Sequence, residues 1–244
     1  HNPKEYNGYK AYWDDGSQLV PPHDKNVINE VKKVQVSDIK FKGIPAMITI
    51  LGKDFDKKYL DKVKTLSLSP EAIQKEHDLR IVFTPLHGTT YELVPASLRN
   101  WGFTNIHTVP EQSIPNGDFP TVASANPEEP AAFKMALDLA RKIDADLAMA
   151  CDPDGDRIGI AVKNDAGEWT LLNGNQTNII FTEYIIRRKK ELNQLKGGEY
   201  TVKTIVTTEL IKDIAEKNHI ICYDVYTGFK WIADIIRKEG GEKF

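Results

Sequence analysis

The sequence predicts an α/β protein in which strands and helices alternate along the chain. A compact run of β-branched and aromatic residues, 79–83, is followed by a Pro/Gly-rich loop, a helical segment at 93–101 and a second strand at 105–109. A similar alternation fills the last third of the chain. We therefore expect parallel strands joined by right-handed helical crossovers, in at least two layers of sheet and helix.

The first group of expected elements lies in residues 1–52. Aromatic residues from Tyr9 to Trp13 are typical of strand material, and turn residues follow at 14–16. A helix is expected over 24–33, because apolar residues recur there three or four positions apart. The Gly-Ile-Pro stretch at 43–45 predicts a break in regular structure.

The middle of the chain carries the clearest signals. The helix at 93–101 should end at Gly102, because a left-handed cap costs glycine least. A further helix is expected over 130–142, and a strand over 146–150 runs directly into an acidic loop.

The last part of the chain continues the alternation. Helices are expected near 176–191, around 210–215 and after Gly228, and strands at 203–207 and 220–225. The final helix should bury a stripe made of Phe229, Ile232 and Ile236.

Composition narrows the class of protein. The 244 residues include 32 Lys and Arg against 35 Asp and Glu, which gives a net charge of −3 without a basic footprint for nucleic acid or an anionic membrane. No apolar run reaches the length of a membrane span. Two cysteines, Cys151 and Cys222, are too few for a disulfide scaffold, so a cytoplasmic globular protein is expected.

The most informative stretch is the loop 152–157, Asp-Pro-Asp-Gly-Asp-Arg. Its three carboxylates, on alternate residues, repel one another unless a cation lies among them. Carboxylate oxygens suit Mg²⁺ or Ca²⁺, and the loop follows a strand, where α/β sheets bind ligands. Arg157 is suited to bind an anion such as phosphate. The loop therefore predicts a divalent-metal site for phosphoryl chemistry.

Residue spacing excludes one other interpretation of this loop and leaves others open. An EF-hand beginning at Asp152 is excluded, because Arg157 and Lys163 occupy the positions of its glycine and glutamate. A phosphatase of the haloacid-dehalogenase type also places Asp-x-Asp-Gly after a strand and would use Asp152 as nucleophile, although Asp156 replaces its usual Thr or Val. That phosphatase, a non-catalytic metal-binding scaffold and a solvated acidic turn stay open as alternatives.

Four segments together resemble the α-D-phosphohexomutase superfamily of phosphoglucomutases, phosphomannomutases and relatives. Residues 1–10 resemble the stretch after its phosphorylated serine, and 84–88 resemble the first loop of its second domain. The acidic loop resembles its metal loop, and 227–232 a sugar-contacting loop of its third domain. Residues 12–16 and 22–24 are most similar to the long phosphoglucomutase/phosphopentomutase-like branch.

The resemblance implies α/β domains of the phosphohexomutase type, with mixed, mostly parallel sheets covered by helices. It divides the chain into the end of domain 1 (residues 1–52), domain 2 with the metal loop (53–172) and an incomplete domain 3 (173–244). The nucleophilic serine would precede His1, and a fourth domain would follow Phe244. We therefore expect a fragment of a longer chain, without mutase turnover of its own.

The resemblance also implies a reaction. A phosphoserine gives its phosphoryl group to a sugar phosphate, and the sugar bisphosphate returns its other phosphoryl group to serine, which converts hexose 1-phosphate to hexose 6-phosphate. The implied cofactors are Mg²⁺ and a sugar bisphosphate activator of the glucose 1,6-bisphosphate type. The implied partner is a phosphorylated sugar, and the identity of that sugar stays open.

Residue roles follow from the same resemblance. The implied metal ligands are Asp152, Asp154 and Asp156, and the implied catalytic residues are Lys10 and His1. The implied substrate-binding residues are Asn2, Arg157, Gly228, Phe229 and Lys230.

Some of these positions also have plain structural explanations. His87 is expected to cap the following helix or to lie exposed, and Trp231 is expected in the core. Lys10 and Lys230 are equally compatible with a solvated face of the protein.

Overall fold

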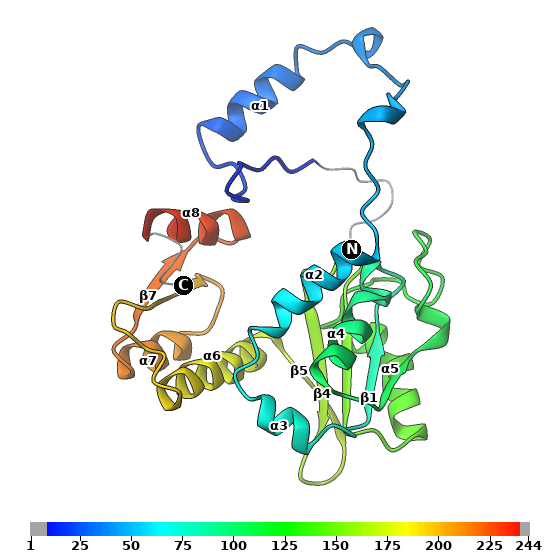
Figure 1. Cartoon of the computed structure of the whole chain (residues 1–244), viewed down its shortest axis with the longest axis vertical. Helices are drawn as coiled ribbons and strands as arrows, with labels where there is room; N and C mark the ends of the chain where they lie inside the picture. The colour runs from blue at the N-terminus through cyan, green and yellow to red at the C-terminus, as the bar shows by residue number, and fades with distance from the viewer. Residues whose placement is uncertain (1–8, 240–244) are drawn as a thin grey trace. The chain divides into compact units, whose positions relative to one another are not determined.

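The computed structural model describes residues 9–239, which form two compact units (Figure 1). Unit 1 holds residues 51–181, and unit 2 holds 9–50 together with 182–239. Each unit has its own sheet and its own helices, and the two are described separately.

Unit 1 is built on a mixed five-stranded sheet with the strand order β2-β1-β3-β4-β5. Strand β1 pairs in parallel with β2 and β3, whereas β3, β4 and β5 form an antiparallel meander. The strands are β1 (Ile81–Thr84), β2 (Ile106–Thr108), β3 (Leu147–Cys151), β4 (Ile158–Lys163) and β5 (Trp169–Leu172). The α/β class with mixed sheets and covering helices is therefore confirmed.

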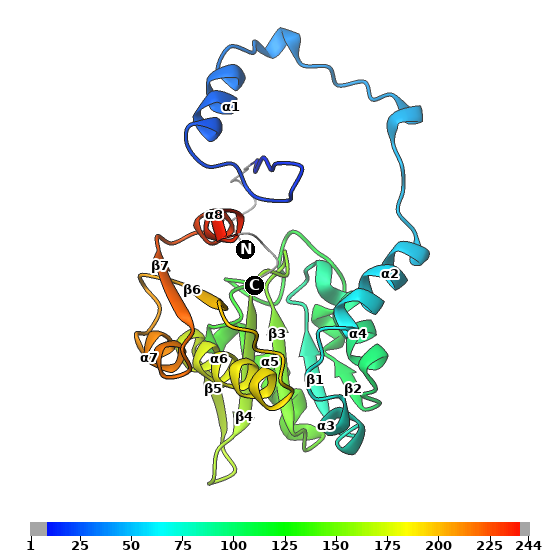
Figure 2. The same ribbon diagram turned by 60° about the vertical axis from the view of Figure 1, so that its left-hand side comes forward.

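The α-helices of unit 1 are α2 (Lys53–Lys64), α3 (Pro70–Lys75), α4 (Leu93–Trp101) and α5 (Pro130–Lys142), and α6 (Gly174–Glu191) continues into unit 2. Short 3₁₀ turns occupy Thr89–Tyr91 and Pro110–Gln112. Helix α4 ends at Gly102, whose φ of 123° lies in the region that glycine adopts without strain, as expected. Figure 2 shows α2 and α4 side by side, and the two helices are in contact.

Helix α5 covers one face of the sheet with a stripe of small residues and one large one. Phe133 is fully buried, and the alanines at 132, 136 and 140 let the helix approach β1 and β3 closely. The cluster also contains Val82, Ala148 and Ala161, one from each of three adjacent strands. This contiguous apolar core fixes the positions of the three strands.

The β4–β5 hairpin was not anticipated from the sequence. The core-facing positions of β4 are Gly159 and Ala161, so the strand lacks the large inward apolar residues that mark a strand in a sequence. A Cβ at Gly159 would lie 2.2 Å from the Pro127 carbonyl oxygen and 3.0 Å from the Phe133 ring. The close approach of two backbones therefore requires glycine at this position.

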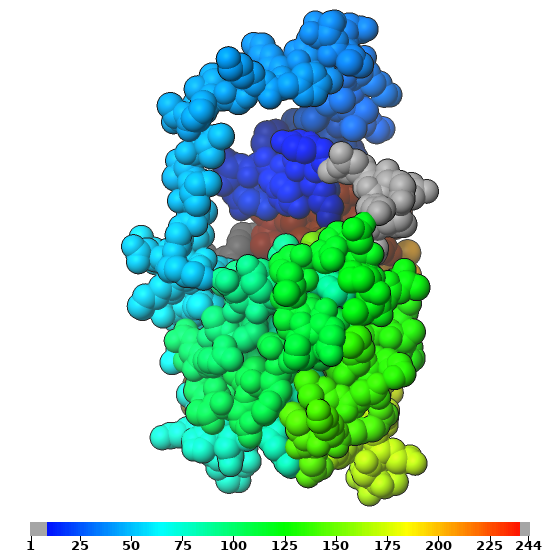
Figure 3. All heavy atoms as spheres, turned by 90° about the vertical axis from the view of Figure 1, so that its right-hand side faces the viewer, coloured from blue at the N-terminus to red at the C-terminus, as the bar shows by residue number. Residues whose placement is uncertain are grey.

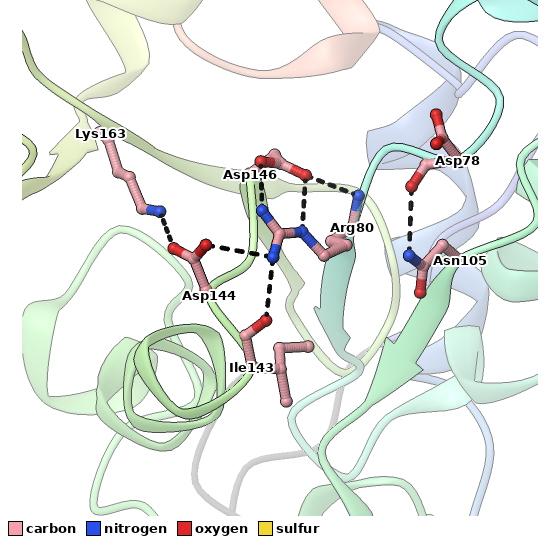
Figure 4. Close-up of polar contacts among 7 residues, drawn as sticks. All are labelled: Asp78, Arg80, Asn105, Ile143, Asp144, Asp146 and Lys163. Atoms are coloured by element: carbon pink, nitrogen blue, oxygen red, sulfur yellow. Dashed lines mark hydrogen bonds and ion pairs between the residues drawn. The ribbon is translucent and has the colours of Figure 1, made fainter.

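The amino ends of β1 and β3 are joined by an ion-pair network (Figure 4). The Arg80 backbone N–H and Nε both donate to Asp146 Oδ2, at 2.9 and 3.2 Å, and Arg80 also pairs with Asp144 at 3.1 Å. Lys163, at the end of β4, pairs with Asp144 at 2.7 Å. Arg80 holds the pKa of the Asp146 carboxyl below its ordinary value, and Lys163 does the same for Asp144.

Unit 2 contains a parallel pair of strands, β6 (Tyr200–Thr204) and β7 (Ile221–Val225). Its further helices are α1 (His23–Val31), α7 (Leu210–Lys217) and α8 (Phe229–Glu239), with 3₁₀ turns at Val36–Asp38 and Pro45–Met47. Ile186, Ala215 and Ile220 form its small core. The buried Lys203 ammonium lies 2.7 Å from Glu209 and 3.0 Å from Asp224, so its charge is paired.

Three expectations for unit 2 are wrong. Residues 9–13 form no strand, because only one bridge joins Tyr12 to Gln18 around the predicted turn. The strand expected at 203–207 lies at 200–204, since the chain turns after Thr204. Phe229 is 72% exposed and does not join a buried stripe, because α8 begins at this residue and buries Ala233 instead.

The segment 34–51 exposes most of its apolar side chains, among them Phe41 at 87% and Ile50 at 85%. In Figure 3 it is the thin light-blue run of side chains. Apart from its two 3₁₀ turns, this segment contains no regular structure. In addition, none of the described helices is long and apolar enough to cross a membrane.

We predict that Phe133→Ala destabilises unit 1 by about 3–5 kcal/mol, because the substitution leaves a cavity between α5 and the sheet. The matched control is Lys142→Ala on the exposed face of the same helix, with an expected change within about 0.5 kcal/mol. Urea unfolding followed by circular dichroism measures both. Equal midpoints for the two variants would contradict the assigned core.

Candidate metal-binding site

The candidate site lies where two loops meet at the carboxyl ends of adjacent strands. Strand β1 leads into the loop 84–90, and β3 leads into the acidic loop 152–157, which connects β3 to β4. Because β1 and β3 are parallel neighbours, both loops emerge at the same edge of the sheet.

The acidic loop brings its three carboxylates together. One oxygen from each of Asp152, Asp154 and Asp156 lies within 4.8 Å of the other two. Asp152 is fully buried, whereas Asp154 and Asp156 are exposed. The loop turns at Gly155, with a φ of 76° and a backbone hydrogen bond from its N–H to the Asp152 carbonyl oxygen. The convergence expected from the alternate spacing is thus present in the structure.

Asp152 is held in one orientation and incompletely satisfied. Its Oδ1 accepts a hydrogen bond from the Arg157 backbone N–H at 3.0 Å. Its Oδ2 is buried without a hydrogen-bond donor among the described residues. Burial, followed by the neighbouring Asp154 carboxyl, raises the pKa of Asp152 to about 6. A buried carboxylate oxygen with no donor is costly unless a cation compensates it.

The donor set fits a hard divalent cation. It consists of three carboxylates, one of them with a lone buried oxygen, and contains neither sulfur nor imidazole. Such oxygen ligands suit Mg²⁺, Ca²⁺ or Mn²⁺. The residues present are therefore compatible with a metal site at this position.

The loop 84–90 packs directly on the acidic loop. The Thr89 backbone N–H and its Oγ1 both donate to the Pro153 carbonyl oxygen, at 2.8 and 3.1 Å. A Cβ at Gly88 would lie 2.2 Å from Pro153 Cα, so the two backbones are in contact there. These contacts fall between the first two aspartates of the loop.

Comparison with known proteins places this arrangement in a family. Sequence models of three alpha/beta/alpha domains of phosphoglucomutase/phosphomannomutase match the chain, domain I over residues 1–37, domain II over 57–167 and domain III over 173–243. The chain belongs to the phosphoglucomutase/phosphomannomutase family. Both loops of the candidate site lie within the match to domain II of this family.

Individual relatives agree with this assignment. A phosphoglucomutase from Staphylococcus saprophyticus is 36% identical over 242 residues, which cover 97% of this chain and 43% of that protein. A phosphomannomutase from Mycoplasmoides pirum is also 36% identical, over 98% of this chain and 43% of its own length. The chain thus spans less than half the length of these curated relatives.

A solved structure shows the same fold. The crystal structure of a phosphoglucomutase/phosphomannomutase family protein from Burkholderia thailandensis matches with a TM-score of 0.59 at 17% identity. The match covers 76% of this chain and 36% of that protein.

The other residues implied by the family resemblance are spread over the chain. Arg157 has an exposed guanidinium 3.9 Å from Asp156, beside the acidic cluster. Lys10, which is exposed, and residues 228–230 belong to unit 2, which is described by itself. His1 and Asn2 lie outside the described residues. Within unit 1, the structure brings together the three aspartates and Arg157.

Within unit 2, the predicted sugar-contacting loop opens helix α8. Gly228 has a φ of 123° and precedes the exposed Phe229. The Lys230 ammonium lies 3.8 Å from Asp24 and 5.0 Å from the centre of the Trp231 ring. Lys230 is therefore half-buried and bound within unit 2, and Trp231 is half-buried beside it.

His87 was misjudged from the sequence. It is buried rather than exposed, and its ring bonds to the Ile114 carbonyl oxygen and to Thr121 Oγ1 instead of capping a helix. The contacts of Gly88 and Thr89 with Pro153 were not foreseen either. The order of strands and loops along the sequence could have indicated these contacts, because loops that follow two neighbouring parallel strands lie close together.

We predict that Asp152→Asn stabilises the metal-free chain near neutral pH. Folding raises the pKa of Asp152 from 3.8 to about 6, so ionisation of this group costs stability as the pH rises through that window. Asparagine keeps the acceptor for Arg157 N–H and removes the charge. We expect about 1–3 kcal/mol of added stability at about pH 7.5, shrinking toward about pH 4.5.

Thermal unfolding in a chelator at both pH values measures this effect. The exposed Asp165→Asn in the β4–β5 turn is the matched control, with no pH-dependent gain. An equal gain for Asp152→Asn at both pH values would contradict the assigned cause.

Proposed function

We propose that this chain provides the metal-holding part of a phosphosugar mutase. Such an enzyme moves a phosphoryl group between the 1- and 6-positions of a hexose through a phosphoserine and a sugar bisphosphate. The observation that carries the proposal is the acidic loop, whose three carboxylates converge and whose buried Asp152 has an oxygen without a donor among the described residues. Its position in a domain II match of the phosphoglucomutase/phosphomannomutase family supports the same activity.

Asp152, Asp154 and Asp156 would hold the metal, and we propose Mg²⁺. When bound, Mg²⁺ supplies positive charge that offsets the negative charge of the phosphoryl group during transfer. Asp152 is oriented for this role, because the Arg157 backbone N–H fixes its Oδ1 and leaves its buried Oδ2 without a donor among the described residues. The exposed Arg157 guanidinium is suited to bind phosphate next to the metal.

The remaining roles concern residues of unit 2 and residues that precede the described range 9–239. Lys10 and His1 are proposed to assist at the phosphoserine, and Asn2 to contact substrate beside them. Gly228, Phe229 and Lys230 are proposed to contact the sugar, and the exposed ring of Phe229 is available for this. A sugar bisphosphate of the glucose 1,6-bisphosphate type is the proposed activator.

We predict that Mg²⁺ stabilises the chain against heat through this loop. At a hundredfold excess over its dissociation constant, a ligand adds about 2.7 kcal/mol. The Mg²⁺-dependent rise in unfolding temperature should vanish in Asp152→Asn and shrink in Asp154→Asn and Asp156→Asn. Asp165→Asn, an exposed carboxylate outside the loop, should respond as the unchanged chain does. A full response in Asp152→Asn would refute the assignment of ligands.

A chimera tests the mutase activity. The segment of the Staphylococcus saprophyticus phosphoglucomutase that aligns with this chain, 43% of that protein, is replaced by this sequence. We expect the chimera to convert glucose 1-phosphate to glucose 6-phosphate, and Asp152→Asn to lower kcat by on the order of a hundredfold or more.

The same chimera carrying Asp165→Asn serves as the control. The proposal fails if a folded chimera is inactive while the parent enzyme is active. It also fails if Asp152→Asn leaves kcat unchanged.

A further inference from the structure

We propose that the loop 84–90 sets the shape of the metal-binding loop, with Gly88 and Thr89 as positioning residues for the metal ligands. This inference rests on the proposed function, since it concerns the same acidic loop. It assigns a role to a segment that contains none of the implied ligands.

Glycine is required at position 88 because the Pro153 backbone lies against it, and not because of a strained backbone conformation. Its φ of −100° and ψ of −170° are extended values that any residue adopts. A Cβ at this position would nevertheless lie 2.2 Å from Pro153 Cα, 2.5 Å from its carbonyl oxygen and 2.7 Å from its carbonyl carbon. Any side chain here must push the acidic loop away at the residue between Asp152 and Asp154.

Thr89 holds the same residue through hydrogen bonds. Two donors, the Thr89 backbone N–H and Oγ1, converge on the Pro153 carbonyl oxygen. They fix the orientation of the peptide group that leads into Asp154. The next residue, Thr90, would clash at 2.6 Å with a Cβ on Gly155, so the contact continues along the loop.

The loop 84–90 is itself held by a chain of hydrogen bonds that begins in the protein interior. The Leu86 N–H donates to Thr84 Oγ1, which donates to Gln112 Oε1 at 2.7 Å, and Gln112 Nε2 donates to Thr121 Oγ1 at 3.0 Å. Thr121 Oγ1 then lies 2.8 Å from His87 Nε2. Thr84, Gln112 and His87 are buried, whereas Thr121 is exposed, so the chain is shielded from water at Thr84 and Gln112 and reaches the surface at Thr121.

His87 completes the chain through both of its ring nitrogens. Its Nδ1 lies 3.2 Å from the Ile114 carbonyl oxygen, which can only accept, so Nδ1 carries the proton. Nε2 is then free to accept from the Thr121 hydroxyl. The network also holds Leu86 and His87 at φ values of 46° and 62°, which non-glycine residues rarely adopt.

These contacts give the acidic loop a rigid support on one side. Three like-charged carboxylates separate unless their backbone is fixed, and separation would cost metal affinity. Changes in residues that orient metal ligands typically weaken metal binding 10–100-fold. The loop after β1 is therefore expected to control affinity without touching the metal.

The test compares Gly88→Ala with Gly117→Ala in the whole chain. Gly117 lies in a neighbouring loop where an added Cβ meets nothing within 4 Å. Calorimetric titration with Mg²⁺ should give a dissociation constant on the order of tenfold or more higher for Gly88→Ala. Gly117→Ala should match the unchanged chain, and both variants should retain their circular dichroism.

A second pair keeps the test decisive if Gly88→Ala does not fold. Thr89→Val removes the Oγ1 donor and should weaken Mg²⁺ binding several-fold, whereas Thr89→Ser should restore it. The electron paramagnetic resonance spectrum of bound Mn²⁺, a similar hard cation, should change in Thr89→Val and not in Thr89→Ser. A merely structural role for Thr89 would leave that spectrum unchanged.

The outcomes separate the two claims. If the unchanged chain binds no Mg²⁺, the proposed function fails and the positioning role fails with it. If the unchanged chain binds Mg²⁺ and folded Gly88→Ala and Thr89→Val bind it equally well, only the positioning role is overturned.

Discussion

The candidate metal site depends most on a carboxylate, Asp152, that is withdrawn from water directly after β3. One of its oxygens is fixed by the Arg157 backbone, and the other has no donor among the described residues. Desolvation of a charged group is expensive, and the raised pKa of Asp152 expresses that cost. This cost in stability supports the proposal that Asp152 binds a cation.

The two ends of the unit 1 sheet differ in how their carboxylates are paired. At the amino ends of β1 and β3, Arg80 and Lys163 neutralise Asp144 and Asp146 in a complete network (Figure 4). At the carboxyl ends, three aspartates converge, and Arg157 Nε lies 3.9 Å from Asp156 Oδ1. The first arrangement aligns strands, whereas the second leaves negative charge that a divalent ion can offset.

Close backbone contact recurs wherever the site must be positioned. Gly88 against Pro153 and Gly159 against Pro127 both bring main chains nearer than any side chain permits. The first contact joins the loops after β1 and β3, and the second seats β4 beneath the start of α5. The first contact lies within the acidic loop, at Pro153, and the second lies two residues after the loop ends at Arg157.

Local sequence determined helices α4 and α5 and the central strands, whereas α2 and α3 were not predicted. Helices α4 and α5 have the bounds that their apolar periodicity and end signals predict, because short-range interactions dominate there. The sequence also predicted the acidic loop as a metal site, since the residue types and spacing of three carboxylates after a buried strand indicate metal binding by themselves. The sequence did not predict the β4–β5 hairpin, because the buried residues of β4, Gly159 and Ala161, are small.

Tertiary structure alone decided the rest. The sequence does not say that Asp152 is fully buried, that His87 closes a hydrogen-bond chain, or that Pro153 touches Gly88. These facts depend on β1 and β3 being adjacent, a pairing of segments more than sixty residues apart. Residue types thus specified which groups could bind a metal, and strand pairing specified how they are held, because orientation arises from contacts between distant parts of the chain.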